Sequence, residues 1–334
     1  MPLLIVSTNY MFYENSGGDL SRIGKISIPK EYRNIFKNEF QKEIRFKDFS
    51  EIDLNKNNSI NILNIGDSFS RQGNIGYQNY LSSYDLSVVN IVTGMNDTDS
   101  PIQLLFSIVN GDILGRLKID YIILETVERS FVSTGLKANM NKKISAQDFS
   151  KTYGGKLKNK EKKTSSLELG IFQDMTFYFL WNILYNFDER AFTSKTYRVN
   201  LTKKLFSTPQ NELLFYRDDV DDIKHNTIES VRELNKTLNI LSKKLNEKGV
   251  KLIVLPAPNK YDVYYNFIAN NHFPPNKFFD YLKEEKKEYI YINSKDLLLQ
   301  HINNGTKDVY FADDSHWSPI ASKIIAKKIF EELN

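Results

Sequence analysis

The chain has 334 residues, of which 41% are hydrophobic and 13% aromatic, so it is long enough to bury a large core. Its 45 basic and 41 acidic residues leave a net charge of +4, which is too weak to indicate a nucleic-acid partner. The absence of cysteine excludes disulfides, a thiolate nucleophile and cysteine-ligated zinc. Because no linker rich in Pro, Gly and Ser divides the chain, we expect a single domain over residues 1–334.

The N-terminal residues 1–6 include four clearly apolar side chains before polar residues follow. This run is too short for a signal peptide or a membrane-spanning helix. It fits either the first strand of a cytosolic protein or the remainder of an N-terminal membrane anchor.

An apolar, β-leaning run at residues 60–65 predicts a strand, and Gly66-Asp67-Ser68 ends it with a turn of small residues. The carboxyl edge of a sheet is where open α/β proteins bind their ligands. The Ser68 hydroxyl is therefore a candidate nucleophile, and its backbone N–H is a candidate oxyanion-hole donor. The alternative is that Ser68 serves only as a helix N-cap.

Further strands and helices follow in alternation. Residues 87–92, 120–125, 250–255 and 289–292 predict strands, and residues 101–109 and 226–248 predict helices. Ser100 is expected to cap the first helix, and Gly249 is expected to end the second. Because strands alternating with helices favour a parallel sheet covered on both faces, we predict a three-layer α/β/α domain.

Residues 131–224 exceed what this fold requires and are expected to form a largely helical insertion. A basic stretch at 151–163 fits either a solvated loop or a groove for an anionic glycan or lipid headgroups. An aromatic-rich segment at 171–187 fits a helical core or lid, or a platform for sugars or a membrane partner. The acidic cluster at 218–222 lacks the glycine and distal glutamate of a calcium loop and is interpreted as a turn before the long helix.

Of the four histidines, only His316 has carboxylates two and three residues before it and a helix after it. Ser318-Pro319 reads as the N-cap and first position of that helix. A loop histidine backed by an aspartate is the arrangement that activates a serine. Asp313 and Asp314 are both candidates to orient His316.

Gly-Asp-Ser early in the chain and Asp-x-x-His late resemble the end blocks of the SGNH, or GDSL-type, hydrolases. That resemblance implies a flavodoxin-like fold with a parallel sheet, a catalytic Ser68 and His316, and an oxyanion hole formed by the N–H groups of Ser68 and Gly94. Simple members carry an Asn donor after the third strand, but this chain has Glu125-Thr126-Val127-Glu128-Arg129-Ser130 there. Either Asn96 substitutes, or the hole uses backbone N–H groups alone.

Three further motifs are similar to those of the polysaccharide O-acetyltransferase branch, which includes alginate O-acetyltransferase-like proteins. These motifs are Glu128-Arg129-Ser130, the segment 256–261 and His316-Trp317. The order of the blocks, with serine first, is instead that of simple SGNH enzymes and DltD-like proteins. The resemblance implies acetyl transfer to a polysaccharide through an acetyl-Ser68 intermediate, without cofactor or metal. It also implies a membrane-bound acetyl-donor partner and a place outside the cytoplasmic membrane, with a cytoplasmic location as the alternative. A carbohydrate acetyl esterase and a glycan-binding module without turnover are the other two readings.

The resemblance leaves two assignments to geometry. The order of the blocks, with serine first, favours Asp313 as the partner of His316, whereas the Asp-x-His-Trp pattern favours Asp314; we expect Asp313. Arg129, Lys260 and Trp317 are candidate substrate-binding residues. For the two cations the alternative is an internal ion pair with Glu125 or Glu128.

Overall fold

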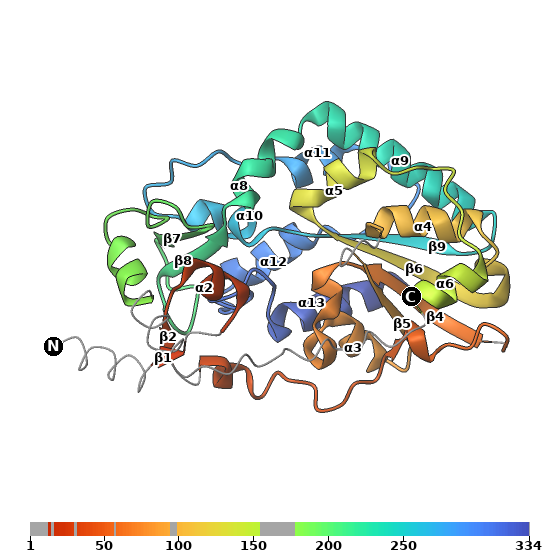
Figure 1. Ribbon diagram of the computed structural model, residues 1–334, viewed down its shortest axis with the longest axis horizontal. Coiled ribbons are helices and arrows are strands. Elements are labelled where there is room, and N and C mark those ends of the chain that lie inside the picture. The colour runs from red at the N-terminus through yellow and green to blue at the C-terminus, as the bar shows by residue number, and fades with distance from the viewer. Residues whose placement is uncertain are drawn as a thin grey trace.

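The computed structural model describes residues 13–14, 17–29, 32–56, 58–93, 99–153 and 178–333. A sheet of six parallel strands, in the order β10-β9-β6-β4-β5-β3, forms the centre of the molecule (Figure 1). The strands are β3 (Lys47–Asp48), β4 (Asn58–Gly66), β5 (Val88–Val92), β6 (Leu117–Val127), β9 (Lys251–Ala257) and β10 (Ile290–Tyr291). Without the edge strand β3 the order is 2-1-3-4-5, which is the flavodoxin-like order. The predicted fold class is confirmed.

The residues of the strands explain why the sheet is buried on both faces. In β4, Ile62 packs into one hydrophobic cluster, whereas Leu63 and Ile65 pack into a second cluster on the opposite face. The same alternation occurs in β6, where Ile123 joins the first cluster and Leu124 the second. Such near-continuous apolar strands are typical of parallel sheets covered by helices on both sides.

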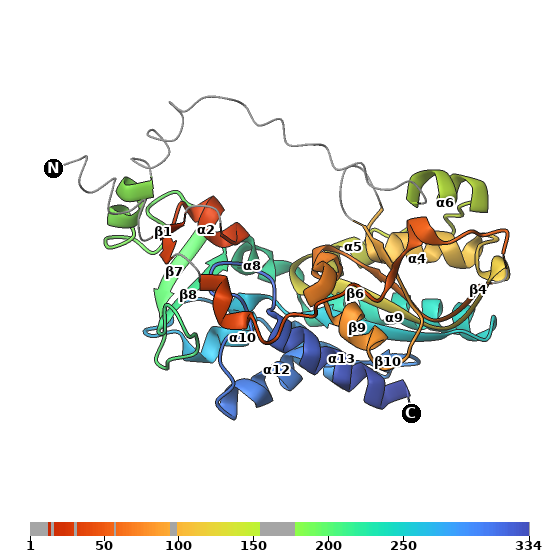
Figure 2. The same ribbon diagram turned by 90° about the horizontal axis from the view of Figure 1, so that it is seen from below.

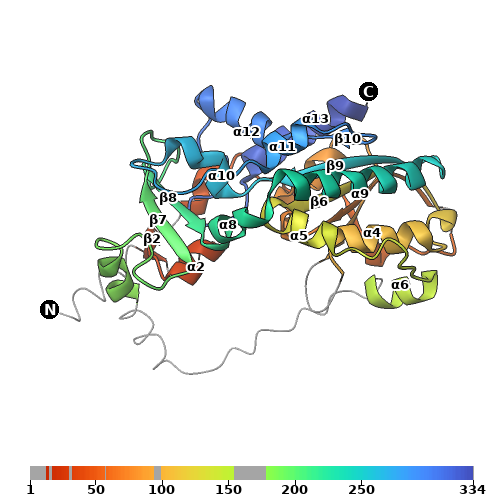
Figure 3. The same ribbon diagram turned by 90° about the horizontal axis from the view of Figure 1, so that it is seen from above.

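Helices cover the two faces of this sheet (Figures 2 and 3). On one face lie α3 (Tyr77–Ser82), α12 (Ser294–Asn303) and α13 (Pro319–Leu333), and on the other lie α4 (Pro101–Asn110), α5 (Glu128–Leu136), α6 (Ala146–Tyr153), α9 (Ile228–Asn246) and α11 (Phe278–Glu284). The predicted helix starts are confirmed where Ser100 caps α4 and Pro319 opens α13. Gly249, at φ 75°, follows the end of α9 in the left-handed region that glycine favours.

A smaller lobe lies beyond the carboxyl ends of the central strands, at the left of Figure 1. It contains β1 (Tyr13–Glu14), α2 (Asp19–Gly24), β2 (Ile28–Pro29) and the antiparallel pair β7 (Thr196–Asn200) and β8 (Glu212–Tyr216). Leu20, Tyr185 and Leu214 belong to its own hydrophobic cluster. The described part of the insertion at 131–224 combines this hairpin with helical segments, which include α6 and most of α5.

The two unusual segments of the insertion are described only in part. Residues 154–163 of the basic stretch and 171–177 of the aromatic segment lie outside the described residues. In the remaining aromatic part, Tyr185 is buried and Trp181 packs beside it, whereas Leu180, Ile183 and Phe187 are exposed. Within the described parts of the chain, no helix has the length and apolarity needed to cross a bilayer.

The remaining described elements are short. These are α8 (Asp218–Asp221), α10 (Lys260–Tyr264) and the 3-10 helices η1 (Tyr32–Phe36), η2 (Phe49–Glu51), η3 (Ser68–Arg71), η4 (Gly73–Ile75), η5 (Leu114–Arg116), η6 (Asp222–His225) and η7 (Tyr265–Phe267). The acidic residues at 218–222 form α8 and the start of η6 just before α9, which agrees with their interpretation as a turn.

Candidate active site

The candidate nucleophile lies where β4 ends and η3 begins. Asp67 is the N-cap of η3, because its Oδ1 accepts a hydrogen bond from the Phe69 N–H at 3.1 Å. The other carboxylate oxygen of Asp67 accepts from the Val127 N–H at 2.7 Å and so ties the end of β4 to the end of β6. Since Asp67 fills the cap position, Ser68 is not the N-cap, and its half-buried hydroxyl is left for another partner.

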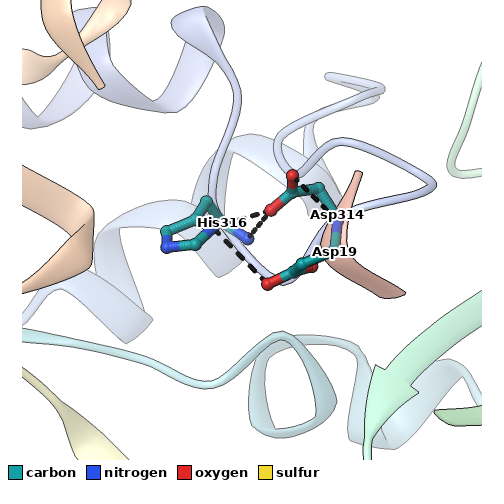
Figure 4. A group of neighbouring side chains, drawn as sticks. All are labelled: Asp19, Asp314 and His316. Atoms are coloured by element: carbon teal, nitrogen blue, oxygen red, sulfur yellow. Dashed lines mark hydrogen bonds and ion pairs between the residues drawn. The ribbon is translucent and has the colours of Figure 1, made fainter. Parts of the chain in front are cut away.

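That partner is His316, in the loop before α13. Its Nε2 lies 2.9 Å from the Ser68 Oγ, and its Nδ1 lies 2.7 Å from Asp314 Oδ1. The ring is tilted against the buried Phe69 ring, with 4.7 Å between the centroids. Figure 4 shows Asp314 and the N-terminal Asp19 beside the histidine. Two hydrogen bonds thus connect a serine, an imidazole and a carboxylate in the order that a catalytic triad requires.

The preference for Asp313 as the partner of His316 is wrong. Asp314 Oδ1 accepts hydrogen bonds from the His316 backbone N–H at 3.0 Å and from the His316 ring. These bonds form a local turn in which the aspartate side chain contacts the residue two positions later in the chain. Asp313 points the other way, is 1% exposed and accepts from the Gly18 N–H at 2.5 Å. The direction of the chain at this turn therefore selects Asp314.

The charges of this pair reinforce one another. Although burial alone would raise it, the pKa of the Asp314 carboxyl is held well below its usual value by the hydrogen bond from His316. Burial alone would lower the pKa of His316, but the hydrogen bond to Asp314 and the negative charges of Asp314 and Asp19 raise it above its ordinary value. Arg129 opposes this rise. The imidazole is therefore a stronger base than a free histidine side chain.

Asp19 places a second carboxylate beside the same ring. Its Oδ2 lies 3.9 Å from His316 Nδ1, and its two oxygens accept hydrogen bonds from the Ser315 N–H at 2.7 Å and the Ser315 hydroxyl at 2.5 Å. Donor atoms of Asp19, Asp314 and His316 all lie within 4.8 Å of one another, which is close enough to surround a metal ion. Because His316 Nδ1 hydrogen-bonds Asp314 and the Asp19 oxygens accept from Ser315, the three groups fit a hydrogen-bonded network better than a metal centre.

Lys260 does not bind substrate in this structure, contrary to the sequence-based prediction. Its side chain is buried at 0% exposure, and its Nζ donates to the backbone carbonyls of Phe311, Ala312 and Asp314 at 2.7, 2.9 and 3.2 Å. Burial lowers the pKa of Lys260 to about 8, while the nearby carboxylates, Asp313 first, oppose the shift. The cation therefore holds the loop that carries the triad's carboxylate.

Arg129 remains partly accessible, with 21% of its side chain exposed. Its guanidinium forms an ion pair with Asp219 at 3.0 Å. The alternative prediction of an ion pair with Glu125 or Glu128 is therefore wrong for Arg129. Burial disfavours the charge of Arg129, but Asp219 beside it raises the pKa. This cation is paired with α8 through Asp219 and also lies over the Tyr216 ring, 5.6 Å from its centroid.

Trp317 is also buried, at 0% exposure, so its predicted role in binding substrate is wrong. Its ring packs edge-on against Phe69 and Tyr77, with centroids 4.8 and 5.9 Å apart. The Gln72 side chain, between η3 and η4, donates to the Trp317 carbonyl at 2.7 Å and so connects this turn to Trp317. Trp317 supports the floor under the nucleophile and histidine instead of contacting a ligand.

The residues that replace the family's asparagine block have structural contacts. Glu125, fully buried, accepts from the Asp67 N–H at 3.1 Å and the Ser70 hydroxyl at 2.7 Å, and burial followed by the charge of Asp67 raises its pKa well above the usual value. Glu128 accepts from the Asn259 N–H at 2.9 Å. These carboxyls join the ends of β4, β6 and β9. The expected oxyanion donors Gly94 and Asn96 lie outside the described residues.

A cavity of about 220 Å³ lies on the other side of the triad loop. Tyr32, Asn182, Arg198, Glu212 and Asp313 are among its lining residues. Ser68 and His316 do not line it, so this cavity is separate from the reacting hydroxyl.

Sequence reasoning missed the N-terminal residues that contact the triad loop. The signal that was available is Gly17-Gly18-Asp19, two glycines followed by a carboxylate. Arg33, whose guanidinium lies 3.5 Å from Asp314 and over the Phe311 ring at 4.1 Å, had no comparable signal.

Comparison with known families agrees with this geometry. Residues 210–334 match the family described as "SGNH hydrolase-like domain, acetyltransferase AlgX". The matched part of the chain is thus similar to an SGNH hydrolase-like domain. This confirms the resemblance to the acetyltransferase branch of the SGNH proteins. Lys260, Asp314 and His316 lie within the matched residues, whereas Ser68 precedes them. Neither the curated proteins nor the solved structures gave a match to the chain.

Proposed function

We propose that this SGNH-like domain transfers an acetyl group through a covalent acetyl-Ser68 intermediate, with a polysaccharide hydroxyl as the acceptor. The observation that carries the proposal is the pair of hydrogen bonds from Ser68 to His316 and from His316 to Asp314. The match of residues 210–334 to an acetyltransferase family supports the type of chemistry. In this function the protein acts outside the cytoplasmic membrane and receives acetyl groups from a membrane-bound donor.

The proposed reaction has two halves. In the first, the Ser68 oxygen attacks the acetyl carbonyl carbon while His316 Nε2 takes the hydroxyl proton. The tetrahedral intermediate then expels the donor's oxygen, to which His316 returns the proton. In the second half, His316 takes a proton from the acceptor hydroxyl, whose oxygen attacks the acetyl-Ser68 carbonyl. The tetrahedral intermediate then expels the Ser68 oxygen, to which His316 returns the proton. Asp314 keeps Nδ1 as the donor and stabilises the imidazolium formed in each half.

The surroundings of Ser68 indicate where the oxyanion is stabilised. The Ser68 N–H is the first of η3 and donates to no described residue, so it is free to face the tetrahedral oxygen. Arg129, with its partly exposed guanidinium, is the cation we assign to an acidic or hydroxyl-rich acceptor. We do not assign an acceptor role to Lys260 or Trp317, because both are buried.

The first test is acetylation of Ser68 by p-nitrophenyl acetate, followed by mass spectrometry of the intact protein and its peptides. We expect one added acetyl group on Ser68. Ser68→Ala should lose about 10³-fold or more of the ester turnover, as expected when a serine nucleophile is removed. The matched variant is Ser70→Ala, because Ser70 lies two residues away and contacts Glu125 but not His316. Full turnover by folded Ser68→Ala would refute the proposal.

The second test separates the transferase from the two alternatives. Acetylated oligosaccharide should accumulate when candidate glycans are added to the acetyl-enzyme. Free acetate as the sole product would identify an esterase. Equal glycan binding by the wild type and Ser68→Ala, without any acetyl-Ser68, would identify a binding module.

A further inference from the structure

The N-terminal residues 17–29 and 32–36 pack directly on the loop that carries Asp314 and His316, almost 300 residues later in the chain. The Ser21 N–H donates to the Asp313 carbonyl at 3.0 Å, and the Asp19 N–H donates to Asp314 Oδ2 at 3.3 Å. From the same segment, the Tyr32 hydroxyl accepts from the Ala312 N–H at 2.5 Å. We call residues 17–29 and 32–36 the N-terminal clamp.

Two glycines allow the N-terminal clamp to approach this closely. A Cβ at Gly17 would lie 2.2 Å from Asp313 Oδ2. A Cβ at Gly18 would lie 2.3 Å from the Asp313 carbonyl oxygen and 2.5 Å from the Cβ of Asp314. The backbone of Asp313 cannot yield to a side chain at position 18, so Gly18 is required for the observed docking, whereas a Cβ at Gly17 would displace the side-chain ends of Asp313 and Ile28.

The docking places Asp19 where it has two kinds of contact with the triad. Through hydrogen bonds to the N–H and hydroxyl of Ser315, its carboxylate fixes the residue between Asp314 and His316. Through space, its Oδ2 lies 3.9 Å from His316 Nδ1. The first contact orients the histidine, and the second adds negative charge beside it.

We propose that Asp19 is a positioning residue of the triad, which orients the Ser315–His316 segment and holds a second negative charge beside the imidazole when it is protonated. The triad is then a four-residue unit whose fourth member comes from the opposite end of the chain. This inference rests on the proposed acyl transfer for its catalytic consequence, but its electrostatic part concerns His316 alone.

The protonation of His316 depends on the charged groups that surround its ring. Asp314 and Asp19 favour the protonated ring, whereas burial and Arg129 disfavour it. Arg33 and Lys260 contact Asp314 and its loop, so they modulate the ring through that carboxylate. Removal of the Asp19 charge should therefore lower the pKa of His316, and the acid limb of the rate profile should move to lower pH.

The test uses Asp19→Asn, Asp19→Ala and the control Asp85→Asn in the full chain. Asn keeps an acceptor and a donor for Ser315 but loses the charge, whereas Ala loses both. Asp85 is exposed, and Asn tolerates its left-handed backbone at φ 59°. Two readouts are taken: the pKa of His316 by NMR titration of labelled histidine, assigned with His316→Ala, and the pH profile of kcat/KM for p-nitrophenyl acetate.

In Asp19→Asn and Asp19→Ala the pKa of His316 should fall by about one unit, as expected for loss of a carboxylate some 4–6 Å away. In Asp19→Ala, kcat should also fall about 100-fold because the ring is no longer held in place. Asp85→Asn should match the wild type in both readouts.

An unchanged His316 pKa in Asp19→Asn would overturn the inference, whether or not the enzyme turns over ester. Equal kcat in Asp19→Ala and Asp19→Asn would overturn the orienting role. If the wild type forms no acetyl-Ser68, the proposed function fails, while the NMR titration still decides the role of the Asp19 charge.

Discussion

Ser68, His316 and Asp314 are each held by a different restraint. The Asp67 cap fixes the turn of Ser68, the Phe69 ring supports the face of His316, and a turn of the chain brings Asp314 to the ring. Asp314 also accepts from Asp19 and Arg33, so both of its oxygens have partners. A carboxylate with this many donors remains ionised and retains one orientation.

The assignment of Asp314 makes a prediction about two neighbouring residues. Asp314→Asn should lower kcat about 10³- to 10⁴-fold, because an amide can favour the wrong histidine tautomer without displacing the ring. Asp313→Asn should lose far less, since Asp313 does not contact His316 and burial already raises the pKa of its carboxyl. Steady-state ester hydrolysis at several pH values measures both. A larger loss in Asp313→Asn would restore the assignment made from block order.

At this scale the sequence predicted two of the three triad residues. Ser68 and His316 stand beside small-residue and helix-start signals that a single sequence displays. The choice between Asp313 and Asp314 depends on which way one turn faces. That direction is set by contacts with Gly18 and Arg33, which lie far away in the sequence, so local spacing could not reveal it.

Among the elements, the loop at 311–316 is held from two sides. The Lys260 ammonium, from the first turn of α10, binds three of its carbonyls, and the N-terminal clamp binds its other face. Both supports are needed because a loop whose polar groups are buried must find partners for them.

Loss of the Lys260 cation should weaken this loop. In Lys260→Met, three buried carbonyls lose a charged donor, and we expect a loss of about 2–4 kcal/mol in the free energy of unfolding. Lys277→Met is the control, because Lys277 is exposed at the start of α11. Urea unfolding of the two variants and the wild type provides the comparison. Equal stability of Lys260→Met and Lys277→Met would show that the cation does not support the loop.

The glycine pair of the N-terminal clamp allows a test of docking itself. Gly18→Ala should displace the clamp and lower kcat about 100-fold, since a shift of about 1 Å at a catalytic group has that effect. Gly115→Ala is the matched control, because a Cβ there meets nothing within 4 Å. Activity and thermal unfolding are measured for both. If Gly18→Ala keeps wild-type kcat, the triad does not need the clamp in its observed position.

For the whole molecule, the periodicity of apolar residues in the sequence was sufficient to predict the central sheet but not the smaller lobe beside it. The alternation of strands and helices correctly predicted β4, β5, β6, β9 and β10 and three of the covering helices, α4, α9 and α13. The hairpin β7–β8 and the N-terminal clamp are stabilised by contacts between distant segments, such as Thr196 with Leu20, and have weak local patterns. Tertiary contacts of that kind override or replace local propensity.

The distance along the chain between Asp19 and Asp314 has a consequence for when the protein becomes active. During synthesis the N-terminal clamp is made well before the loop at 311–316 that it contacts. Ser68 is likewise made 248 residues before His316, whose ring it contacts. Under the proposed acyl transfer, a growing chain that lacks His316 has no base for Ser68, and reactivity begins only when the N-terminal clamp docks on the completed loop.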